Sequence, residues 1–580
     1  MIKLFRRYYQ FITKYKRKFI IFNLVVVVTA VLETLNPYFY KLLIDNLSSR
    51  DYWLLVKIII LFVGVKILAN LSHAMNYWLG DKILIPAARD VRLAVFRRIQ
   101  ELDFAYHVNK NTGSLISAFK RGDGAFFDIF HSINHELARL LISLLVALYF
   151  FVRVTPSIAF ILLGFFIANI FISWRLIKHN MRIRREFNRS EDAVSGIITD
   201  NLLNYETVKF FAQEKKEEAR LQKQFEDWFE KLWAFANSFR LMDVMVGSLA
   251  NIGMLVILWV TLKKMVSQEI SSGDFILVAS FMTGFYYRFF DLLYRMRHVA
   301  RHYVDIKKYL EILEQPILVK DPEKPVDLLK VKGEIEFQDV DFAYPDSKRK
   351  MILKDINLKI KPGESVAFVG RSGAGKTTLV KILLRFYDLN QGRILLDGVD
   401  IADFAKSRLR LFIGVVPQEP VLFNNTVGFN ISYGNDQVSQ AEIVKAAKTA
   451  NLDRFIDGLP KKYETEVGER GIKLSGGQKQ RLAIARMILA DPQIIVFDEA
   501  TSNLDSESER LIQEALWKIA RGRTVLIIAH RFSTVRKADR IIVMNHGRIA
   551  EEGSHQNLIK RQKGLYQYLW QLQTKGELDE

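Results

Sequence analysis

Long apolar segments alternate with highly charged ones over residues 1–313. A helix needs about 20 apolar residues to cross the hydrocarbon core of a bilayer. Six segments are long enough, near residues 19–47, 53–77, 132–154, 157–175, 242–262 and 275–295. Polar residues such as Glu33, Lys57 and Lys66 interrupt several of them, so the second segment is a weaker candidate than the fourth. A soluble helical bundle is the alternative, but the nearly unbroken apolar run from Ile20 to Leu32 argues against it. The pattern predicts an α-helical polytopic membrane domain of six transmembrane helices.

The basic residues between these segments predict their orientation, because cytoplasmic connections carry an excess of Lys and Arg. Residues 1–18 contain seven Lys and Arg and no acidic residue. The connections 78–131 and 176–241 are long and rich in Lys and Arg, whereas the other three are short. We therefore expect both termini in the cytoplasm. The membrane that we expect is a bacterial inner (plasma) membrane, in which the protein is integral. The start of the chain predicts an interfacial helix and not a secretory signal, because the apolar run is too long and no cleavage site of small residues follows.

The two long connections are predicted to be helices that continue the membrane segments into the cytoplasm. Apolar and aromatic residues over 210–232 recur at spacings of three, four and seven, as a packed helix face requires. Each connection has a break near its middle, at Asn109–Gly113 and at Asn201–Asn204. We expect a helical hairpin with a short transverse element at each break.

Polar residues within the spans are costly in hydrocarbon and often face a cavity or a partner helix. Interhelical packing, or snorkelling to the interface, is the alternative for each of them. We expect the cluster of Tyr286, Tyr287 and Arg288 on the last span to line a cavity. The other candidates are Glu33, Asn36, Lys66, Asn70, Asn76, Arg139, Asn251, Thr283 and Asp291.

Proline and charge change near residue 314. The segment 314–332 contains three prolines and many charges and predicts a linker between two unlike parts of the chain. Of the formal net charge of +20, residues 1–332 carry 46 Lys and Arg against 31 Asp and Glu, or +15, and the remainder carries 37 against 32, or +5. The excess of basic residues therefore follows the predicted membrane topology more than a nucleic-acid partner. The 580 residues include no cysteine, which excludes disulfides, thiol catalysis and cysteine-ligated metals.

After residue 332 short β-rich runs alternate with helical ones, which predicts an α/β domain over 333–580. The apolar strand ending at Val369 runs into Gly370-Arg-Ser-Gly-Ala-Gly-Lys376-Thr377-Thr378, and a helical segment follows. This is a phosphate-binding loop in the strand–loop–helix context that it requires. Its glycines let backbone N–H groups point at phosphates, while Lys376 is expected to reach the β- and γ-phosphates and Thr377 to bind Mg²⁺.

Two further apolar strands end in chemically useful side chains. The strand 494–498 ends in Asp498, a candidate Mg²⁺ ligand, and Glu499 follows as a candidate general base for the attacking water. His530 follows the strand 524–529 and is predicted to contact the γ-phosphate. A strand end that only caps a helix, and an ordinary histidine, are the alternatives.

The segment Leu474-Ser475-Gly476-Gly477-Gln478 identifies the family. With it, the chain resembles an ABC transporter, of the exporter (B) type in which one chain fuses six transmembrane helices to one α/β P-loop ABC ATPase domain. The resemblance covers essentially the whole chain and implies three regions: a transmembrane domain over 1–313, a linker over 314–332 and a nucleotide-binding domain over 333–580. It further implies ATP and Mg²⁺ as cofactors.

The resemblance also assigns roles to individual residues. It implies that Tyr344 stacks on adenine, that Gln418 forms the Q-loop, and that Thr465–Gly471 and Ser502–Asp505 are the X-loop and D-loop. Asn503 departs from the usual Ala, which puts D-loop communication in question but not catalysis. The expected nucleotide-binding residues are Tyr344, Gly370, Arg371, Ser372, Gly373, Ala374, Gly375, Lys376, Thr377, Thr378, Ser475, Gly476, Gly477 and Gln478. The expected metal ligands are Thr377, Gln418 and Asp498, and the expected catalytic residues are Glu499, His530 and Gln418.

What the resemblance implies for assembly is a head-to-tail dimer, with two ATP molecules between the loop of one protomer and the 475–478 signature of the other. Because every catalytic motif is present, a second copy of this chain suffices as the partner, and a heterodimer stays open. The transverse elements then become coupling helices. The one over Asp200–Phe211 resembles the mitochondrial and heavy-metal-tolerance branch closely, and the one over Asn111–Gly122 does so less well. Gln478 stands where that branch would have Glu.

These observations predict an ATP-driven exporter of a small molecule by alternating access. In the branch that it resembles, the cargo would be a glutathione-like or thiol-conjugated compound; a lipid or a hydrophobic drug is the alternative. A soluble ABC ATPase acting on nucleic acid is disfavoured by the six spans, so no nucleic-acid partner is expected. A channel-like protein gated by ATP is disfavoured because no catalytic motif is degraded.

Overall fold

The structure is a computed structural model that describes residues 2–109, 112–345, 350–435, 437–468, 471, 473–498, 506–528 and 532–576. The chain divides into two compact units, and each unit consists of two separate segments of the sequence. The first unit comprises Met1–Glu101 and Lys110–Gln315, and the second comprises Leu102–Asn109 and Pro316–Glu580. The boundary at Gln315 falls within the predicted linker.

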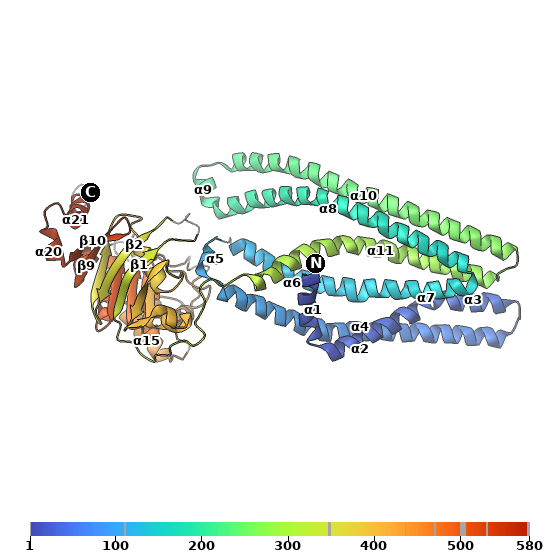
Figure 1. Ribbon diagram of the computed structural model, residues 1–580, viewed down its shortest axis with the longest axis horizontal. Helices are drawn as coiled ribbons and strands as arrows, with labels where there is room; N and C mark the ends of the chain where they lie inside the picture. The colour runs from blue at the N-terminus through green and yellow to red at the C-terminus, as the bar shows by residue number, and fades with distance from the viewer. Residues whose placement is uncertain are drawn as a thin grey trace. The chain divides into compact units, whose positions relative to one another are not determined.

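All regular secondary structure in the described part of the first unit is helical (Figure 1). Its α-helices are α1 (Ile2–Thr13), α2 (Lys16–Thr34), α3 (Asn36–Leu47), α4 (Tyr52–Glu101), α6 (Thr112–Phe130), α7 (Ala138–Val154), α8 (Pro156–Leu203), α10 (Glu214–Val266) and α11 (Ser272–Glu311), with α9 (Tyr205–Phe210) between α8 and α10. A π-helical segment, η1 (His131–Leu137), joins α6 to α7, and a 3₁₀ turn, η2 (Ile312–Glu314), follows α11. Helices α8 and α10 pack along each other, as do α2 and α4 (Figure 1).

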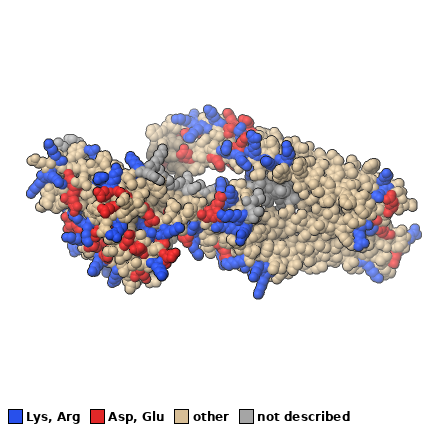
Figure 2. Space-filling view, in the orientation of Figure 1, with Lys and Arg blue, Asp and Glu red and all other residues tan. Residues whose placement is uncertain are grey.

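Five helical segments of this unit are long and apolar enough to cross a membrane, within the described part of the chain. They are Lys16–Leu47, Tyr52–Glu101, Ala118–Val154, Pro156–Leu203 and Glu214–Val266. Figure 2 shows a broad band without charged side chains over these helices, with Lys, Arg, Asp and Glu at both of its ends. The sixth predicted span begins in the apolar segment Ser272–Phe285, and its later side chains, including Tyr286, Tyr287 and Arg288, lie outside the described residues. The helical membrane domain is therefore confirmed.

Helix α4 has 50 residues, α8 has 48 and α10 has 53. At 1.5 Å per residue each is about 70–80 Å long, more than twice the thickness of the hydrocarbon core. The prediction that helices continue well past the membrane is confirmed. The predicted break at Asn201–Asn204 is also found, because α8 ends at Leu203 and the short α9 follows.

The position predicted for the first transverse element is wrong. The predicted break at Asn109–Gly113 is found, because α5 (Phe104–Asn109) ends at Asn109 and α6 begins at Thr112. The short helix precedes this break, however, and the segment from Thr112 onward, expected to be the transverse element, belongs to α6. The chain leaves α4 at Leu102 and Asp103, and the carboxylate of Asp103 accepts hydrogen bonds from the backbone N–H groups of Leu318 and Val319, at 2.5 and 3.2 Å. The turn between α4 and α5 is therefore held by residues more than 200 positions later in the chain, and no local pattern in the sequence reveals this contact.

The second unit contains two sheets (Figure 1). The antiparallel sheet has the order β2-β1-β4-β5, from β1 (Ile335–Phe342), β2 (Leu353–Ile360), β4 (Gln391–Leu396) and β5 (Val399–Asp400). The larger sheet has the order β10-β9-β3-β8-β7-β6, from β3 (Ser365–Val369), β6 (Ile413–Val416), β7 (Ile494–Asp498), β8 (Thr524–Ile528), β9 (Arg540–Asn545) and β10 (Arg548–Gly553). Strands β9, β3, β8, β7 and β6 are parallel, and β10 is antiparallel to β9.

Helices complete this unit. They are α12 (Lys376–Leu383), α13 (Lys406–Phe412), α14 (Val427–Ser432), α15 (Gln440–Thr449), α16 (Asp453–Asp457), α17 (Gly476–Ala490), α18 (Ser506–Ala520), α19 (Phe532–Val535), α20 (His555–Ile559) and α21 (Leu565–Gly576). Short 3₁₀ turns, η3 (Ile401–Asp403) and η4 (Lys462–Glu464), lie between them.

Two apolar cores lie on the two faces of the larger sheet. Successive residues of a strand point to opposite faces, and in β3 Val366 and Phe368 join one core while Ala367 and Val369 join the other. All five residues of β3 are buried, as expected for a parallel strand that is covered on both sides. The α/β fold of this unit is confirmed.

The predicted linker has no helix or strand over 316–334, yet it is fastened to the second unit. The buried guanidinium of Arg385 donates to the carbonyl oxygen of Lys320 at 2.7 Å, and Arg408 donates to that of Leu328 at 3.0 Å. Val319 and Val331 are buried. Hydrogen bonds and burial therefore give this segment a defined path.

Candidate functional site: a nucleotide site and two cavities among the helices

The residues predicted to handle a nucleotide follow four neighbouring parallel strands at one edge of the sheet. Phe368 near the end of β3 pairs with Ile528 at the end of β8, and Ile528 pairs with Asp498 at the end of β7. Val416 at the end of β6 pairs with Phe497. Because carboxyl ends of parallel strands meet at one sheet edge, the phosphate-binding loop, Asp498 and the Q-loop all begin there.

The phosphate-binding loop is shaped by glycines that no other residue could easily replace. Gly373 has a φ of +78° and Gly375 a φ of +104°, both in the left-handed region that side chains with a Cβ rarely adopt. A Cβ on Gly375 would lie 2.7 Å from Cδ2 of Leu353. Gly375 is also the N-cap of α12, so the loop delivers the chain directly to the N-terminus of a helix, where backbone N–H groups favour anions.

The polar side chains of the loop divide into buried and exposed ones. Lys376 is buried, and its Nζ donates to the carbonyl oxygens of Gly370 at 2.7 Å and Arg371 at 3.3 Å. The ammonium therefore lies across the mouth of the loop. Arg371, Ser372 and Thr377 are exposed, while Ala374 is buried.

Thr378 and Tyr344 form a pair beneath the loop. Thr378 is buried, and its Oγ1 lies 3.1 Å from the Oη of Tyr344. The ring of Tyr344 packs edge-on against Tyr387, with centroids 5.2 Å apart. The two adjacent threonines thus differ: Thr378 fixes an aromatic ring, and the exposed Thr377 hydroxyl is the one suited to a cation.

The signature helix is fastened to the Q-loop. Gln480 on α17 is buried, and its Nε2 donates to the backbone carbonyl oxygens of Pro417 at 3.1 Å and Gln418 at 2.5 Å. The side chain of Gln418 is on an exposed residue. The sequence identified both motifs, but gave no sign that a glutamine two residues after the signature connects them.

The signature itself begins a helix. Ser475 is the N-cap of α17, and its Oγ accepts from the N–H of Gln478 at 3.3 Å, while Oε1 of Gln478 accepts from the N–H of Ser475 at 2.9 Å. This is a capping box, which either Gln or Glu completes. The departure from Glu at position 478 therefore preserves the helix start and removes only a charge. Gly476 and Gly477 form the first turn.

The C-terminal helix reaches the phosphate-binding loop, a contact that the sequence did not reveal. The guanidinium of Arg371 lies over the ring of Tyr568 on α21, 5.7 Å from its centroid. Tyr566 anchors α21, because it is fully buried and its Oη lies 2.8 Å from Nδ1 of His555. Burial raises the pKa of Tyr566, and burial together with the charge of Arg536 lowers the pKa of His555.

Several predicted site residues cannot be placed. Glu499 and His530, the D-loop over 502–505 and positions 469, 470 and 472 lie outside the described residues. What the structure places is consistent with a Mg²⁺–nucleotide: a buried lysine on glycine-shaped backbone, an exposed threonine and a carboxylate on the same sheet edge. Thr377, Gln418 and Asp498 supply the oxygen donors that Mg²⁺ prefers.

Helix α5 packs within the second unit through aromatic contacts. The ring of Phe104 stacks on that of Phe386, with centroids 4.6 Å apart, and meets Tyr387 edge-on at 6.2 Å. The ammonium of Lys381 lies 5.8 Å from the centroid of Phe104 and 5.7 Å from that of Tyr344. A row of rings therefore leads from α5 to the tyrosine expected to stack on adenine.

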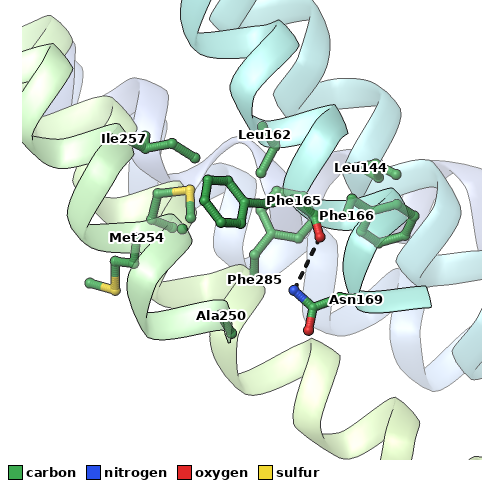
Figure 3. Close-up of a pocket in the computed structure, with 11 residues that line it drawn as sticks. Leu144, Leu162, Phe165, Phe166, Asn169, Ala250, Met254, Ile257 and Phe285 are labelled. Carbon is green, nitrogen blue, oxygen red and sulfur yellow. Dashed lines mark hydrogen bonds between the residues drawn. The ribbon is translucent and has the colours of Figure 1, made fainter. Parts of the chain in front are cut away.

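In the first unit, a small pocket lies between α7, α8, α10 and α11 (Figure 3). Most of its lining is apolar or aromatic, including Phe165, Met254 and Phe285. Among the described lining residues the one polar side chain is Asn169, which is buried and whose Nδ2 donates to the carbonyl oxygen of Phe165 at 3.1 Å (Figure 3). The Oδ1 of Asn169 has no hydrogen-bond partner among the described residues. The pocket therefore offers one hydrogen-bond acceptor to a ligand that is otherwise apolar.

A larger and charged cavity lies farther along α8. It is open to solvent and is lined by residues of α6, α8, α10 and α11. Its charged lining residues are Arg121, Arg184, Arg185, Lys308, Glu191, Asp192 and Asp305. Arg121 pairs with Asp305 at 3.7 Å, and the guanidinium of Arg184 lies 5.5 Å from the ring centroid of Phe235. The cavity can thus meet both carboxylates and ammonium groups of a ligand.

Comparison with known proteins agrees with this architecture. Residues 19–289 match the model of the ABC transporter transmembrane region, and residues 353–502 match the ABC transporter model. The chain is 34% identical over 562 residues to ATP-binding cassette sub-family B member 6 of Mesocricetus auratus, covering 94% of this chain and 66% of that protein. It thus spans slightly less than two thirds of the length of that relative.

Two further matches cover more of the compared chain. Heavy metal tolerance factor 1 of Caenorhabditis elegans is 31% identical over 546 residues, covering 93% of this chain and 68% of that protein. A solved structure described as a bacterial Atm1-family ABC exporter with ATP bound matches with a TM-score of 0.86 at 32% identity, covering 96% of this chain and 98% of that one. The chain therefore belongs to the ABC transporter family, as an exporter-type half-transporter that fuses a transmembrane domain to an ABC domain and lies nearest to the Atm1 and heavy-metal-tolerance branch.

Proposed function

We propose that this protein is an ATP-driven exporter whose cargo is an amphipathic anion of the glutathione- or thiol-conjugate class. The observation that carries the cargo proposal is the presence of two unlike cavities along one helix. Asn169 of the apolar pocket and Met181 of the charged cavity both lie on α8. They are 12 residues apart, or about 18 Å along a helix axis.

A glutathione conjugate matches this pair of cavities chemically. Its peptide part bears carboxylates and an ammonium group, which suit the arginines and carboxylates of the charged cavity. Its conjugated group is commonly apolar, which suits Phe165, Met254 and Phe285. A carrier for such compounds needs no thiol of its own, and the chain has no cysteine.

The nucleotide site supplies the proposed driving force. Glu499 orients and deprotonates the attacking water, while Lys376 and His530 stabilise the charge that develops on the γ-phosphate. Bound Mg²⁺, held by Thr377, Gln418 and Asp498, would offset charge on the β- and γ-phosphates. Tyr344 stacks on the adenine, and its hydroxyl is already positioned by Thr378.

The proposed assembly is a homodimer with two nucleotides between its ABC domains. The 475–478 signature of one copy faces the phosphate-binding loop of the other, and the capping box keeps the N-terminus of α17 intact for this contact. A second feature that supports a partner is the strongly exposed apolar surface at α9, where Leu203, Phe210 and Phe211 are 70–82% exposed. Such a surface is typical of a protein–protein contact. We place the assembly in a bacterial inner membrane with both termini in the cytoplasm.

The test is ATPase stimulation of the purified full-length chain in lipid nanodiscs. Oxidised glutathione and glutathione S-conjugates are compared with lipids and amphipathic drugs. We expect the conjugates to stimulate turnover most, and Arg184→Gln to raise the concentration needed for half-maximal stimulation. Arg182→Gln is the matched control, because Arg182 is exposed on the same helix and does not line the cavity. Stimulation by lipids or drugs alone would contradict the cargo class and favour a flippase or multidrug exporter.

A further inference from the structure

The N-terminal helix α1 is held on the transmembrane unit by one face. Tyr8 and Ile12 are buried, and the Oη of Tyr8 donates to the carbonyl oxygen of Phe126 at 2.9 Å. The Oη of Tyr9 donates to Oδ1 of Asn134, in the π-helical segment, at 3.3 Å. The helix therefore has a fixed orientation, and its opposite face, at positions 3, 6 and 10, is exposed.

Basic side chains gather on that exposed face and on the turn that follows it. Lys3, Arg6, Lys16, Arg17 and Lys18 are all exposed, and the first acidic residue of the chain is Glu33. Only Lys3 of these five forms an ion pair with a described residue, at 3.3 Å from Glu314. We call these five residues the N-terminal basic surface. Four of its charges have no protein counter-charge within the described chain.

This surface lies where the first membrane segment begins. That segment starts at Lys16, so Lys16, Arg17 and Lys18 occupy its first turn. Lys and Arg at the boundary of a span lie at the depth of lipid headgroups, and clusters of four to eight attract anionic lipids of the cytoplasmic leaflet. Helix α2 adds to the attraction. Its N-terminus carries the positive end of the helix dipole, which repels the three basic side chains of the first turn, and a bound anion offsets this repulsion.

Helices α1 and α4 are both tied to the last residues of the first unit, α1 through Arg7 and α4 through Arg98. Nη1 of Arg7 lies 2.5 Å from Oε1 of Glu314, which ends η2, and Nη2 of Arg98 donates to the carbonyl oxygen of Gln315 at 2.6 Å. The second unit begins at the next residue, Pro316. Whatever fixes α1 against the membrane surface therefore also restrains the segment from which the chain enters its ABC domain.

We propose that the N-terminal basic surface binds the phosphate headgroups of anionic phospholipids, and that this binding raises ATP turnover through the contact of Arg7 with Glu314. The proposal rests on the cytoplasmic position of the N-terminus. It does not depend on the identity of the cargo, because basal turnover is the measured activity. Charge complementarity selects an anionic lipid as the occupant.

The test uses the full-length protein purified from mixed phosphatidylcholine and phosphatidylglycerol micelles, with the retained lipids quantified by mass spectrometry. We expect the wild type to enrich phosphatidylglycerol and K16Q/R17Q/K18Q to lose that enrichment several-fold. The matched control is K215Q/K216Q/K223Q, which removes the same charge from exposed lysines of α10 that precede the apolar residues 242–262 of this helix by several turns. Basal ATPase activity in pure phosphatidylcholine verifies that both variants fold.

A second measurement follows basal turnover in nanodiscs. Phosphatidylglycerol is expected to raise turnover of the wild type and of the control, but not of K16Q/R17Q/K18Q, and the rise is expected to be smaller in Glu314→Gln. Equal loss of enrichment in the two triple variants would show that the lipid responds to the net charge of the protein and not to this surface, and would overturn the proposal. So would displacement of the lipid by inorganic phosphate, which would indicate a site for a soluble anion. Enrichment without any change in turnover would overturn the regulatory half.

Discussion

The ring of Phe104 on α5 stacks on that of Phe386, which follows the helix of the phosphate-binding loop, with the two planes inclined by only 6°. An aromatic pair of this kind contributes about 0.5–1.5 kcal/mol beyond its buried area. Lys381 lies over the ring of Phe104 and over that of Tyr344. The stack therefore connects α5 with the expected adenine-binding position through a short row of side chains.

Phe104→Ala is expected to uncouple cargo from ATP hydrolysis. Because the stack is lost while the phosphate-binding loop is intact, basal ATPase activity should persist and stimulation by cargo should fall several-fold. The measurement is ATPase activity with and without a stimulating conjugate. Val108→Ala serves as the control, since Val108 is on the same short helix and is 63% exposed. Full stimulation in Phe104→Ala would show that α5 does not transmit the signal.

Glu499→Gln tests the assignment of the general base. The amide keeps the size of the side chain but cannot accept a proton, so turnover should fall by about 10²–10⁴-fold. Binding of a fluorescent ATP analogue should stay near the wild-type level. Substantial residual hydrolysis would assign the base to another group.

Variants of Gln478 test the capping box. Gln478→Ala removes the acceptor for the N–H of Ser475 and is expected to lower the free energy of unfolding by about 1 kcal/mol. Gln478→Glu preserves the box and places a negative charge at the positive end of a helix, so its stability should equal or slightly exceed that of the wild type. Thermal unfolding of the full-length chain distinguishes the two. Equal destabilisation by both substitutions would mean that the amide itself is required.

Gln480→Leu tests the connection between the signature helix and the Q-loop. The substitution leaves the carbonyl groups of Pro417 and Gln418 without their side-chain donor. The loss of a buried donor is expected to cost about 1–3 kcal/mol in the free energy of unfolding. We expect a lower Tm together with reduced ATPase activity. A variant with wild-type Tm and turnover would show that the Q-loop holds its path without this amide.

The environment of His555 predicts a pH dependence of stability. Its pKa is lowered from the ordinary 6.5, so the folded state favours the neutral ring. The unfolded state binds the proton more readily, and the stabilisation is therefore present above pH 6.5 and is lost as the pH falls through the lowered pKa. Thermal unfolding should show the advantage of the wild type over His555→Asn shrinking toward acid. An advantage that grows toward acid would contradict the sign of the shift.

Motifs and apolar periodicity predicted much of this molecule, because both are local properties of the chain. The glycines of the phosphate-binding loop, the strand ending at Asp498 and the helix start at Ser475 are each encoded within about ten residues, and each is found. The break at Asn204 is similarly local. The lengths of α4, α8 and α10 also follow from continuous helical sequence without a strong breaker, although α4 contains Pro86.

The structural features that the sequence did not predict depend on contacts between distant residues. The short helix α5 lies earlier in the chain than the sequence predicts, because Asp103 accepts hydrogen bonds from the backbone of Leu318 and Val319. The role of Gln480 and the contact of Arg371 with Tyr568 likewise join segments that are 62 and 197 positions apart. The charged cavity assembles from four helices, and no single helix carries its composition as a pattern. Glu499 and His530 stay predictions.

The membership of α5 in the second unit bears on how an isolated ABC domain should be produced. A fragment that begins at Pro316 would omit residues 102–109 and leave the rings of Phe386 and Tyr387 without the one that covers them. Such a fragment would expose an aromatic patch to solvent, and we expect it to aggregate at high concentration. Supplying residues 102–109 as a tethered peptide would restore the missing piece. The compact unit that contains the ABC domain is thus assembled from two separate stretches of the chain.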